Sequence, residues 1–164
     1  MREINLTQGE TAKVDDEDFE WLNSFKWCTH KNINNFYAIR SVRVNGKKVS
    51  QKMNQLIMGD NPLKLMIDHR DGNGLNNQKS NLRFCTNQEN QMNQRPQKNC
   101  SSVYKGVYWQ KQKKRWRARI KINRKFTHIG YFKIEEDAAR AYNAAAIKSF
   151  GEFAYLNLFN KTNA

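Results

Sequence analysis

The sequence predicts an α+β fold assembled from small parts, and three observations carry this prediction. Alternating apolar and polar residues, which are typical of strands, occur in short runs from Phe36 to Val44 and from Arg115 to Ile122. A single long helical pattern, from Ile134 to Phe150, follows the last strand signal. A polar stretch from Gln91 to Asn99, which contains the second of two prolines, separates these C-terminal elements from the rest. We therefore expect modules with modest cores rather than one large domain.

The expected boundaries divide residues 1–160 of the 164-residue chain into four parts. They are a small N-terminal α+β unit at 1–58, a middle segment at 59–93, a linker at 94–101 and a C-terminal domain at 102–160.

Composition excludes several classes of protein. The mean hydropathy of −0.92 leaves no apolar run long enough to span a bilayer, so no membrane partner is expected. The first residues lack the apolar segment of a secretory signal, which predicts a location in the cytoplasm. Three cysteines without a CxxC pair disfavour a disulfide scaffold and a four-cysteine zinc site.

The net charge of +14 and the pI near 9.9 point to a polyanionic partner, nucleic acid first. The excess is local, because stretches divided at Gly59 and Lys98 carry +2, +1 and +11. Ten basic and no acidic residues lie between Val103 and Lys125, interleaved with tyrosine and tryptophan.

The N-terminal third combines strand and helix signals. A short strand at Ala12–Val14 precedes four acidic residues, Asp15 to Asp18, which favour the positive end of a helix that runs to about Ser24. The alternating run to Val44 meets Asn45-Gly46, a dipeptide typical of a tight hairpin turn, and the chain returns over Lys47–Met53. A short helix at 52–58, ended by Gly59, completes this unit.

The C-terminal pattern predicts an antiparallel meander of strands at 104–110, 115–122 and 125–132. In the middle strand, Trp116, Ala118, Ile120 and Ile122 alternate with Arg115, Arg117, Arg119 and Lys121, so one face is apolar and the other is cationic. The helix at 134–150, with three acidic residues at its start and Gly151 after its end, should cover the apolar face. The exposed cationic face then suits nucleic acid.

This C-terminal part resembles the AP2 DNA-binding domain over about 102–157. The resemblance rests on Tyr104-Lys105-Gly106-Val107, Trp116-Arg117-Ala118-Arg119-Ile120, Ile129-Gly130-Tyr131-Phe132 and the run from Ala138 to Ala146. It implies that the sheet enters the major groove of double-stranded DNA. By motif position, the DNA-facing residues would be Lys105, Tyr108, Gln110, Arg117, Arg119, Lys121, Phe126 and His128.

The middle segment is a predicted strand, loop, strand and helix of about 30 residues. The strands are expected at Leu63–His69 and Leu82–Cys85, with a loop at 72–80 between them. Thr86 and Glu89 have the spacing of a capping box, which starts the helix.

The residues in this segment suit phosphodiester hydrolysis, which needs a base and a cation. His69 can act as the base, and its neighbour Asp68 as an oxygen ligand for a hard ion such as Mg²⁺, with Asp71 as the alternative carboxylate. Asn90, one turn into the helix, would add a second oxygen ligand. The Asn81 carbonyl could accept the Nδ1 proton of His69 and leave Nε2 as the basic nitrogen.

Over about 63–92 the sequence resembles the HNH (His-Me finger, ββα-metal) endonuclease motif. Its homing-enzyme form, D-H-x-D-x-N-x-x-N-N-x-x-x-N-L-R, is present from Asp68 to Arg83, and Asn90 follows on the helix. The resemblance implies His69 as general base, Asn81 as its orienting partner, and Asp68 with Asn90 as ligands of one divalent ion, Mg²⁺ first and Mn²⁺ second.

Together the two resemblances predict a homing-type DNA endonuclease or nickase that binds double-stranded DNA and needs no obligate protein partner. They also imply a bacterial or phage-infected host cell as its setting, with an organelle as the alternative. Nicking is the simpler expectation, because one chain has one metal centre. Two other classes stay open. One is a non-catalytic, sequence-specific DNA-binding regulator with a degenerate HNH centre, which the intact set of four HNH residues disfavours. The other is a nonspecific nuclease toxin, which the lack of a secretion signal disfavours.

Overall fold

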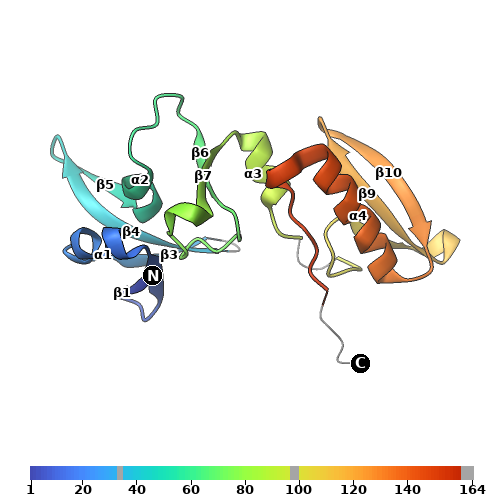
Figure 1. Cartoon of the computed structure of the whole chain (residues 1–164), viewed down its shortest axis with the longest axis horizontal. Coiled ribbons are helices and arrows are strands. Elements are labelled where there is room, and N and C mark those ends of the chain that lie inside the picture. Colours follow the sequence, from blue (N-terminus) through green and yellow to red (C-terminus); the bar gives the residue numbers. More distant parts are fainter. Residues whose placement is uncertain (33–34, 97–99, 160–164) are drawn as a thin grey trace. The chain divides into compact units, whose positions relative to one another are not determined.

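The computed structural model describes residues 1–32, 35–96 and 100–159. They form two compact units, Met1–Asn90 and Gln91–Ala164, and Figure 1 labels the elements of each. The mixture of short strands and helices is an α+β fold, as the sequence predicts. Within the described ranges, no helix is long and apolar enough to cross a membrane.

In its described residues, the first unit contains three small antiparallel sheets and short helices. Its strands are β1 (Arg2–Asn5) paired with β2 (Thr11–Val14), the meander β3 (Cys28–Asn32), β4 (Asn35–Val44) and β5 (Lys47–Lys52), and β6 (Met66–His69) paired with β7 (Leu82–Cys85). Its helices are α1 (Asp16–Asn23), α2 (Met53–Met58), the 3₁₀ turn Lys79–Asn81, and α3 (Asn87–Asn93), which continues into the second unit.

The N-terminal elements and the middle segment share one hydrophobic core. Trp27, Leu22 and Met53 are almost fully buried in it, and Leu75 from the middle segment packs into the same cluster. The backbone of Lys13 in β2 forms two hydrogen bonds with the loop that carries Leu75. Its N–H donates to Leu75 O (2.8 Å), and its carbonyl accepts from the N–H of Asn77 (2.8 Å). The loop between β6 and β7 is thereby fixed to the N-terminal sheet.

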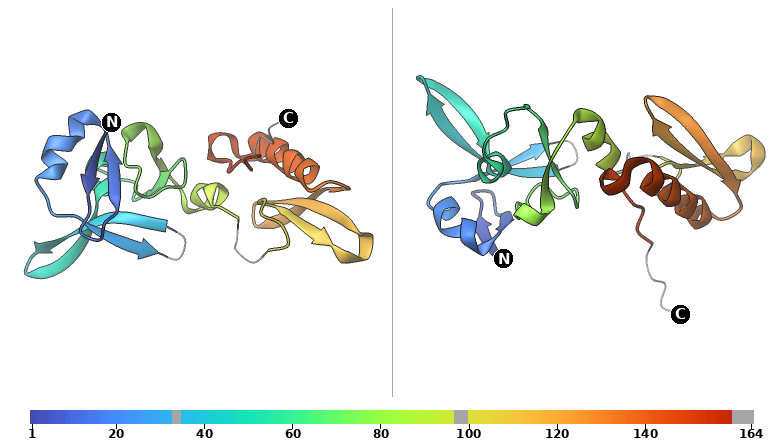
Figure 2. Two further views of the ribbon diagram at one scale, coloured as in Figure 1. Left: turned by 90° about the horizontal axis from the view of Figure 1, so that it is seen from below. Right: turned by 45° about the horizontal axis from the view of Figure 1, so that its top comes forward.

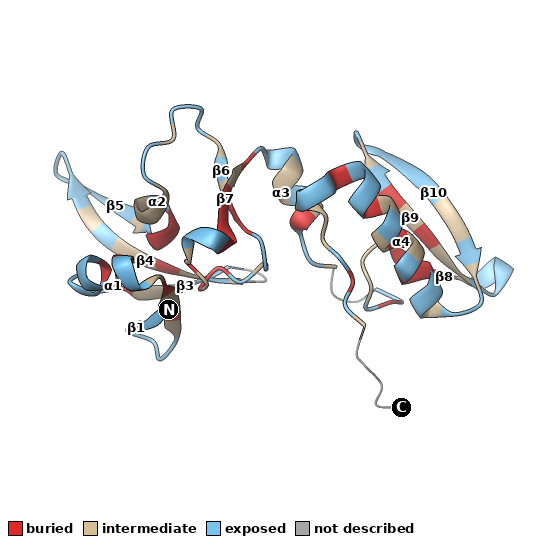
Figure 3. Ribbon diagram, viewed as in Figure 1, coloured by how far each residue is buried: buried red, intermediate tan, exposed pale blue. Residues whose placement is uncertain are grey.

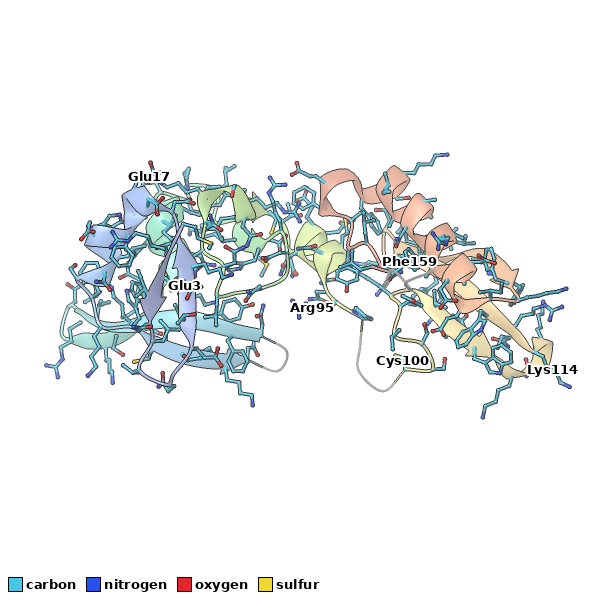
Figure 4. The ribbon with its side chains drawn as sticks, turned by 60° about the horizontal axis from the view of Figure 1, so that its bottom comes forward. Glu3, Glu17, Arg95, Cys100, Lys114 and Phe159 are labelled. Atoms are coloured by element: carbon cyan, nitrogen blue, oxygen red, sulfur yellow. The ribbon has the colours of Figure 1, made fainter. Side chains whose placement is uncertain are left out.

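The second unit is a three-stranded antiparallel sheet with one helix on it. The strands are β8 (Val107–Gln110), β9 (Arg115–Ile122) and β10 (Lys125–Phe132), in the spatial order β10-β9-β8, and the helix is α4 (Glu135–Phe150). The 3₁₀ turn Lys111–Lys113 lies between β8 and β9, and the 3₁₀ turn Gly151–Phe153 follows α4. Lys114, labelled in Figure 4, adopts a left-handed conformation where the chain turns from β8 into β9.

Helix α4 covers the apolar face of this sheet, as Figures 2 and 3 show. Ala118 and Ile120 of β9 are buried against the small residues and Tyr142 of α4. Gly106 lies so close to the Tyr142 ring that a Cβ atom there would come within 2.1 Å of it, and its φ of +77° also favours glycine. The close packing leaves the opposite face of the sheet to solvent.

Most predicted elements are confirmed, with differences at strand starts. The hairpin at 36–53, the strand at 82–85, the C-terminal strands and the long helix lie where expected. The strand expected from Leu63 begins at Met66, because Lys64 turns in a left-handed conformation. The strand expected from Tyr104 begins at Val107, because a turn precedes it. Strands β1 and β3 were not predicted.

The proposed linker at 94–101 includes residues 97–99, and the predicted C-terminal domain ends at residue 160. These positions lie outside the described residues.

Candidate active site and nucleic-acid interface

His69 is the last residue of β6, paired with Leu82 of β7. Its side chain is 4% exposed, and its ring packs against the ring of Tyr37 in β4, with 5.9 Å between centroids. His69 ends the β6–β7 pairing, and the chain turns directly after it, because the N–H of Gly72 donates to His69 O (2.8 Å).

Asn77 fixes the orientation of the His69 imidazole. The Asn77 Oδ1 atom lies 3.2 Å from Nε2 of His69, and the carboxamide NH₂ of Asn77 donates to Leu75 O (3.3 Å). An amide oxygen only accepts, so this contact is a hydrogen bond in the tautomer that carries the proton on Nε2 and the lone pair of the neutral ring on Nδ1. The sequence predicts Asn81 as the partner of Nδ1 and Nε2 as the basic nitrogen, whereas the structure places the Asn77 oxygen at Nε2.

Burial lowers the pKa of His69. The hydrogen bond to Asn77 and the carboxylates of Asp71 and Asp68 raise the pKa, but the effect of burial is larger. A lowered pKa keeps the imidazole neutral at neutral pH, which is the form that a general base needs.

Asn81 organises the loop after His69. Its carboxamide donates to Asp71 Oδ1 (3.0 Å) and Asn76 O (2.8 Å), and its Oδ1 accepts from the backbone N–H of Asp71 (3.1 Å). Its backbone carbonyl accepts from the N–H of Arg70 (2.9 Å). The contacts that Asn81 makes therefore hold the loop that directly follows the predicted base.

The carboxylate of Asp71 is also part of this loop. Burial would raise its pKa, but hydrogen bonds from Asn76, from the backbone of Asn73 and from Asn81 outweigh burial and lower it. Asp71 thus stays ionised as an acceptor for loop groups.

Asp68 is buried beside Arg83, its partner across the two strands. Nε and Nη2 of Arg83 donate to the same oxygen of Asp68, Oδ2, at 2.9 and 2.7 Å. The Asn90 amide nitrogen lies 3.8 Å from Sδ of Met66, which stands on the same face of β6 as Asp68. The two predicted ligands are therefore on one side of the strand.

This donor set fits a hard divalent ion. Asp68 and Asn90 both offer oxygen atoms, which Mg²⁺ prefers, and a carboxylate can bind an ion through one oxygen while a cation holds the other. No group of three or more His, Cys, Asp or Glu side chains suited to a metal occurs in the described part of the chain. A metal site at Asp68 would therefore need amide and water oxygens in addition to this carboxylate.

The N-terminal elements shape this site in a way that sequence reasoning missed. The Asn35 carboxamide donates to Gly72 O (3.0 Å) and accepts from the N–H of Gly74 (3.0 Å). A Cβ atom at Gly74 would lie 2.4 Å from Phe36 O, so the loop packs directly on β4. Asp15 accepts from the N–H of Lys79 (2.8 Å). No local pattern reveals these contacts, because the partners are distant in the sequence.

Seven of the eight predicted DNA-facing residues gather on the cationic face of the C-terminal sheet. The Arg119 guanidinium lies 4.0 Å from the Phe126 ring and 4.7 Å from the Tyr108 ring. The remaining members on this face are Gln110, Arg117, Lys121 and His128. Alternating cations and aromatic rings make a surface able to contact phosphates and bases.

Tyr131 is an unpredicted member of this face. It pairs with Arg117, and its ring lies 4.6 Å from that of His128, which itself is 3.2 Å from Nε of Arg117. The irregularity between His128 and Gly130 brings His128 and Tyr131 to the same side.

Lys105 lies apart from the other seven. Its ammonium donates to Met92 O at 2.5 Å and lies 3.5 Å from Gln91 O, so it binds the last carbonyls of α3. Burial lowers the pKa of Lys105 to about 8. Lys105 therefore links the start of the second unit, at Gln91 and Met92, to the rest of that unit.

Comparisons with known proteins point to the same segment. A family model described as HNH endonuclease matches residues 48–92. The chain is 39% identical over 102 residues to the "Uncharacterized HNH endonuclease L560" of Acanthamoeba polyphaga mimivirus, covering 62% of this chain and 52% of that protein. It is also 39% identical over 62 residues to "Protein 3.8" of Escherichia phage T7, covering 38% of this chain and 51% of that protein.

The chain spans about half the length of these curated relatives. The segment matched by the family model contains His69, Asp68, Asn77, Asn81 and Asn90. The part of the chain that holds the candidate base is thus similar to HNH endonucleases, which supports a nuclease.

Proposed function

We propose that this protein is a site-specific DNA endonuclease or nickase of the HNH homing type. The observation that carries the proposal is the environment of His69: a buried imidazole with a lowered pKa, held through Nε2 by Asn77, inside the segment similar to HNH endonucleases. This arrangement prepares one ring nitrogen for proton abstraction.

In the proposed reaction, Nδ1 of His69 takes a proton from a water molecule that attacks the phosphorus atom. Asn77 accepts from Nε2–H throughout, which stabilises the imidazolium that forms. Asn81 holds the loop, and with it the direction of the ring. The P–O bond opposite the attacking oxygen breaks, and the leaving oxygen takes a proton from solvent.

Asp68 and Asn90 would hold one divalent ion, Mg²⁺ first and Mn²⁺ as the alternative. When bound, such an ion supplies positive charge that stabilises the phosphate and the leaving oxygen. Arg83, whose Nε and Nη2 donate to Oδ2 of Asp68, holds that carboxylate in place.

The C-terminal unit would act as an AP2-like domain that recognises double-stranded DNA. Its cationic face offers Arg117, Arg119 and Lys121 to the backbone or to base edges, and its apolar face is occupied by α4. One centre per chain predicts a nick without an obligate protein partner. The phage relative supports a setting in a bacterial or phage-infected cell.

Incubation of the purified protein with supercoiled plasmid tests the proposal. We expect nicked circles with Mg²⁺ or Mn²⁺ and intact plasmid with EDTA. Tight DNA binding without cleavage in either metal would instead favour a non-catalytic DNA-binding regulator, since the cationic sheet serves both functions.

A further inference from the structure

We propose that the β4–β5 hairpin carries a second DNA-binding surface, which contacts backbone phosphates about six base pairs from the cut. We call this surface the hairpin face. It consists of Ser41, Arg43, Lys48, Ser50 and Lys52. The inference rests on the proposed function, because it takes DNA as the substrate.

The strand register places these five residues on one side of the hairpin. Arg43 pairs with Lys48, Ser41 with Ser50, and Lys52 with Ile39, and paired residues share a face. All five are exposed. In Figures 1 and 2 this hairpin projects beyond the rest of its unit, so its end is accessible to a large partner.

The hairpin face begins at the candidate base. Tyr37 alternates onto the same side of β4, its ring contacts the His69 ring, and the Lys52 ammonium lies 5.1 Å from the Tyr37 ring. If a phosphate of a DNA strand reached His69, Lys52 would lie next to that phosphate. The strand could then continue along the hairpin face toward Arg43 and Lys48.

The charge of the hairpin suits a polyanion. Residues 40–52 contain five basic and no acidic side chains, although residues 1–59 as a whole carry only +2. Arg40, on the other side of the hairpin, is used for packing, with its guanidinium 3.7 Å from the Phe25 ring. Within the described residues, Arg43 and Lys48 form no salt bridge, so their charges remain available to phosphates.

The length of the hairpin sets the position of the contact. Six residue steps along β4, from Tyr37 to Arg43, span about 20 Å. That distance corresponds to about six base pairs of duplex, at about 3.4 Å each. Phosphates near that position should lie against Arg43 and Lys48.

The test compares two double variants of the full chain with equal loss of charge. Arg43→Gln with Lys48→Gln changes the hairpin face, and the control, Lys31→Gln with Lys47→Gln, changes the opposite side of the same sheet. DNA affinity is measured in EDTA from 50 to 200 mM salt. The unfolding midpoint of each variant, followed by circular dichroism, shows that the fold is retained.

We expect the hairpin-face variant to lower the log-log salt slope by about 1.8, which is about 0.9 for each phosphate contact. Its defect in affinity should then be about twelve-fold larger at 50 mM than at 200 mM salt. Hydroxyl-radical footprints should lose protection about six base pairs from the nick. The control variant should match the wild type in both measurements.

A wild-type slope in the hairpin-face variant, or an equal loss in both variants, would overturn the inference. Because binding is measured without metal, a wild type that binds but never cuts removes the proposed catalysis and leaves this test valid. A wild type that does not bind DNA removes both proposals.

Discussion

The side chain of Asn77 supports the predicted base, and its removal should slow cleavage. Asn77→Ala leaves Nε2–H of His69 without its acceptor and frees the ring to rotate or change tautomer. The loss of such a supporting group typically costs about 10- to 100-fold in metal-site enzymes, and we expect a similar fall in the rate at saturating DNA.

Asn77→Asp keeps an acceptor oxygen and should recover part of the rate, which a purely structural role would not predict. The exposed Asn23→Ala is the matched control. Equal activity in Asn77→Ala and wild type would exclude the positioning role.

The two predicted metal ligands should respond to metal concentration. Asp68→Ala is unsuitable, because it leaves Arg83 buried without its partner, a defect that typically costs about 3 to 5 kcal/mol. Asp68→Asn and Asn90→Ala should each shift the Mg²⁺ dependence of nicking to higher concentration, whereas Asp60→Asn, an exposed carboxylate, should not. An unchanged titration in either variant removes that residue from the ligand set.

The buried Lys105 should make stability depend on pH. Its pKa is about 8 in the folded chain and about 10.4 when unfolded, so between these values the unfolded state binds more protons and stability rises with pH. From pH 7.5 to 9.5 the gain is about 2 kcal/mol.

Denaturant unfolding of the wild type and Lys105→Met at both pH values isolates this effect, since the variant lacks the group. A wild type and a variant with the same pH dependence would contradict the burial of the ammonium.

At the scale of single residues, the sequence predicted the position of His69 but not its contact with Asn77. The string from Asp68 to Arg83 places the histidine at a strand end. The contact depends on Lys13, whose backbone holds Asn77 from a strand more than sixty residues away. The catalytic and ligand roles of His69, Asn81, Asp68 and Asn90 stay predictions.

Among the elements, the C-terminal sheet should provide most of the DNA affinity. Arg119→Ala and Lys121→Ala should each lower the salt slope by about 0.9 where the side chain contacts a phosphate. A side chain that reads a base edge should instead cost about 1 to 3 kcal/mol at one base position. Arg140→Ala on α4, where the guanidinium packs 4.5 Å from the Phe159 ring, is the control.

Binding curves on randomised sites separate the two kinds of contact. Wild-type affinity in both sheet variants would remove this face from the interface.

Elements with strong local signals were predicted well, and those formed by pairing were not. Asn45-Gly46 fixes the β4–β5 hairpin because both residues have positive φ, as the turn requires. Strand β3, with the sequence Cys-Thr-His-Lys-Asn, has no apolar alternation and exists because β4 pairs with it. The basic hairpin was also missed, because the net charge was summed over the whole N-terminal third, where acidic residues elsewhere nearly cancel it.

At the scale of the whole molecule, the structure divides the chain at Gln91, the first residue of the polar stretch. The second unit begins at Gln91, because Met92 packs with Ile120 and Tyr142 and its carbonyl accepts from the N–H of Tyr155 (3.3 Å). The N-terminal α+β elements and the middle segment form one unit around a shared core. Neither arrangement has a local signature, since each depends on contacts between distant residues.

The account as a whole assigns cutting to the first unit and most of the binding to the second. The most direct measurement is to compare His69→Ala with the wild type for plasmid nicking in Mg²⁺ and for DNA affinity in EDTA. We predict that nicking falls by about 10²- to 10⁴-fold while affinity stays within about two-fold, because the base acts only in the transition state. Nicking at the wild-type rate by His69→Ala, or a parallel loss of nicking and affinity, would contradict the account.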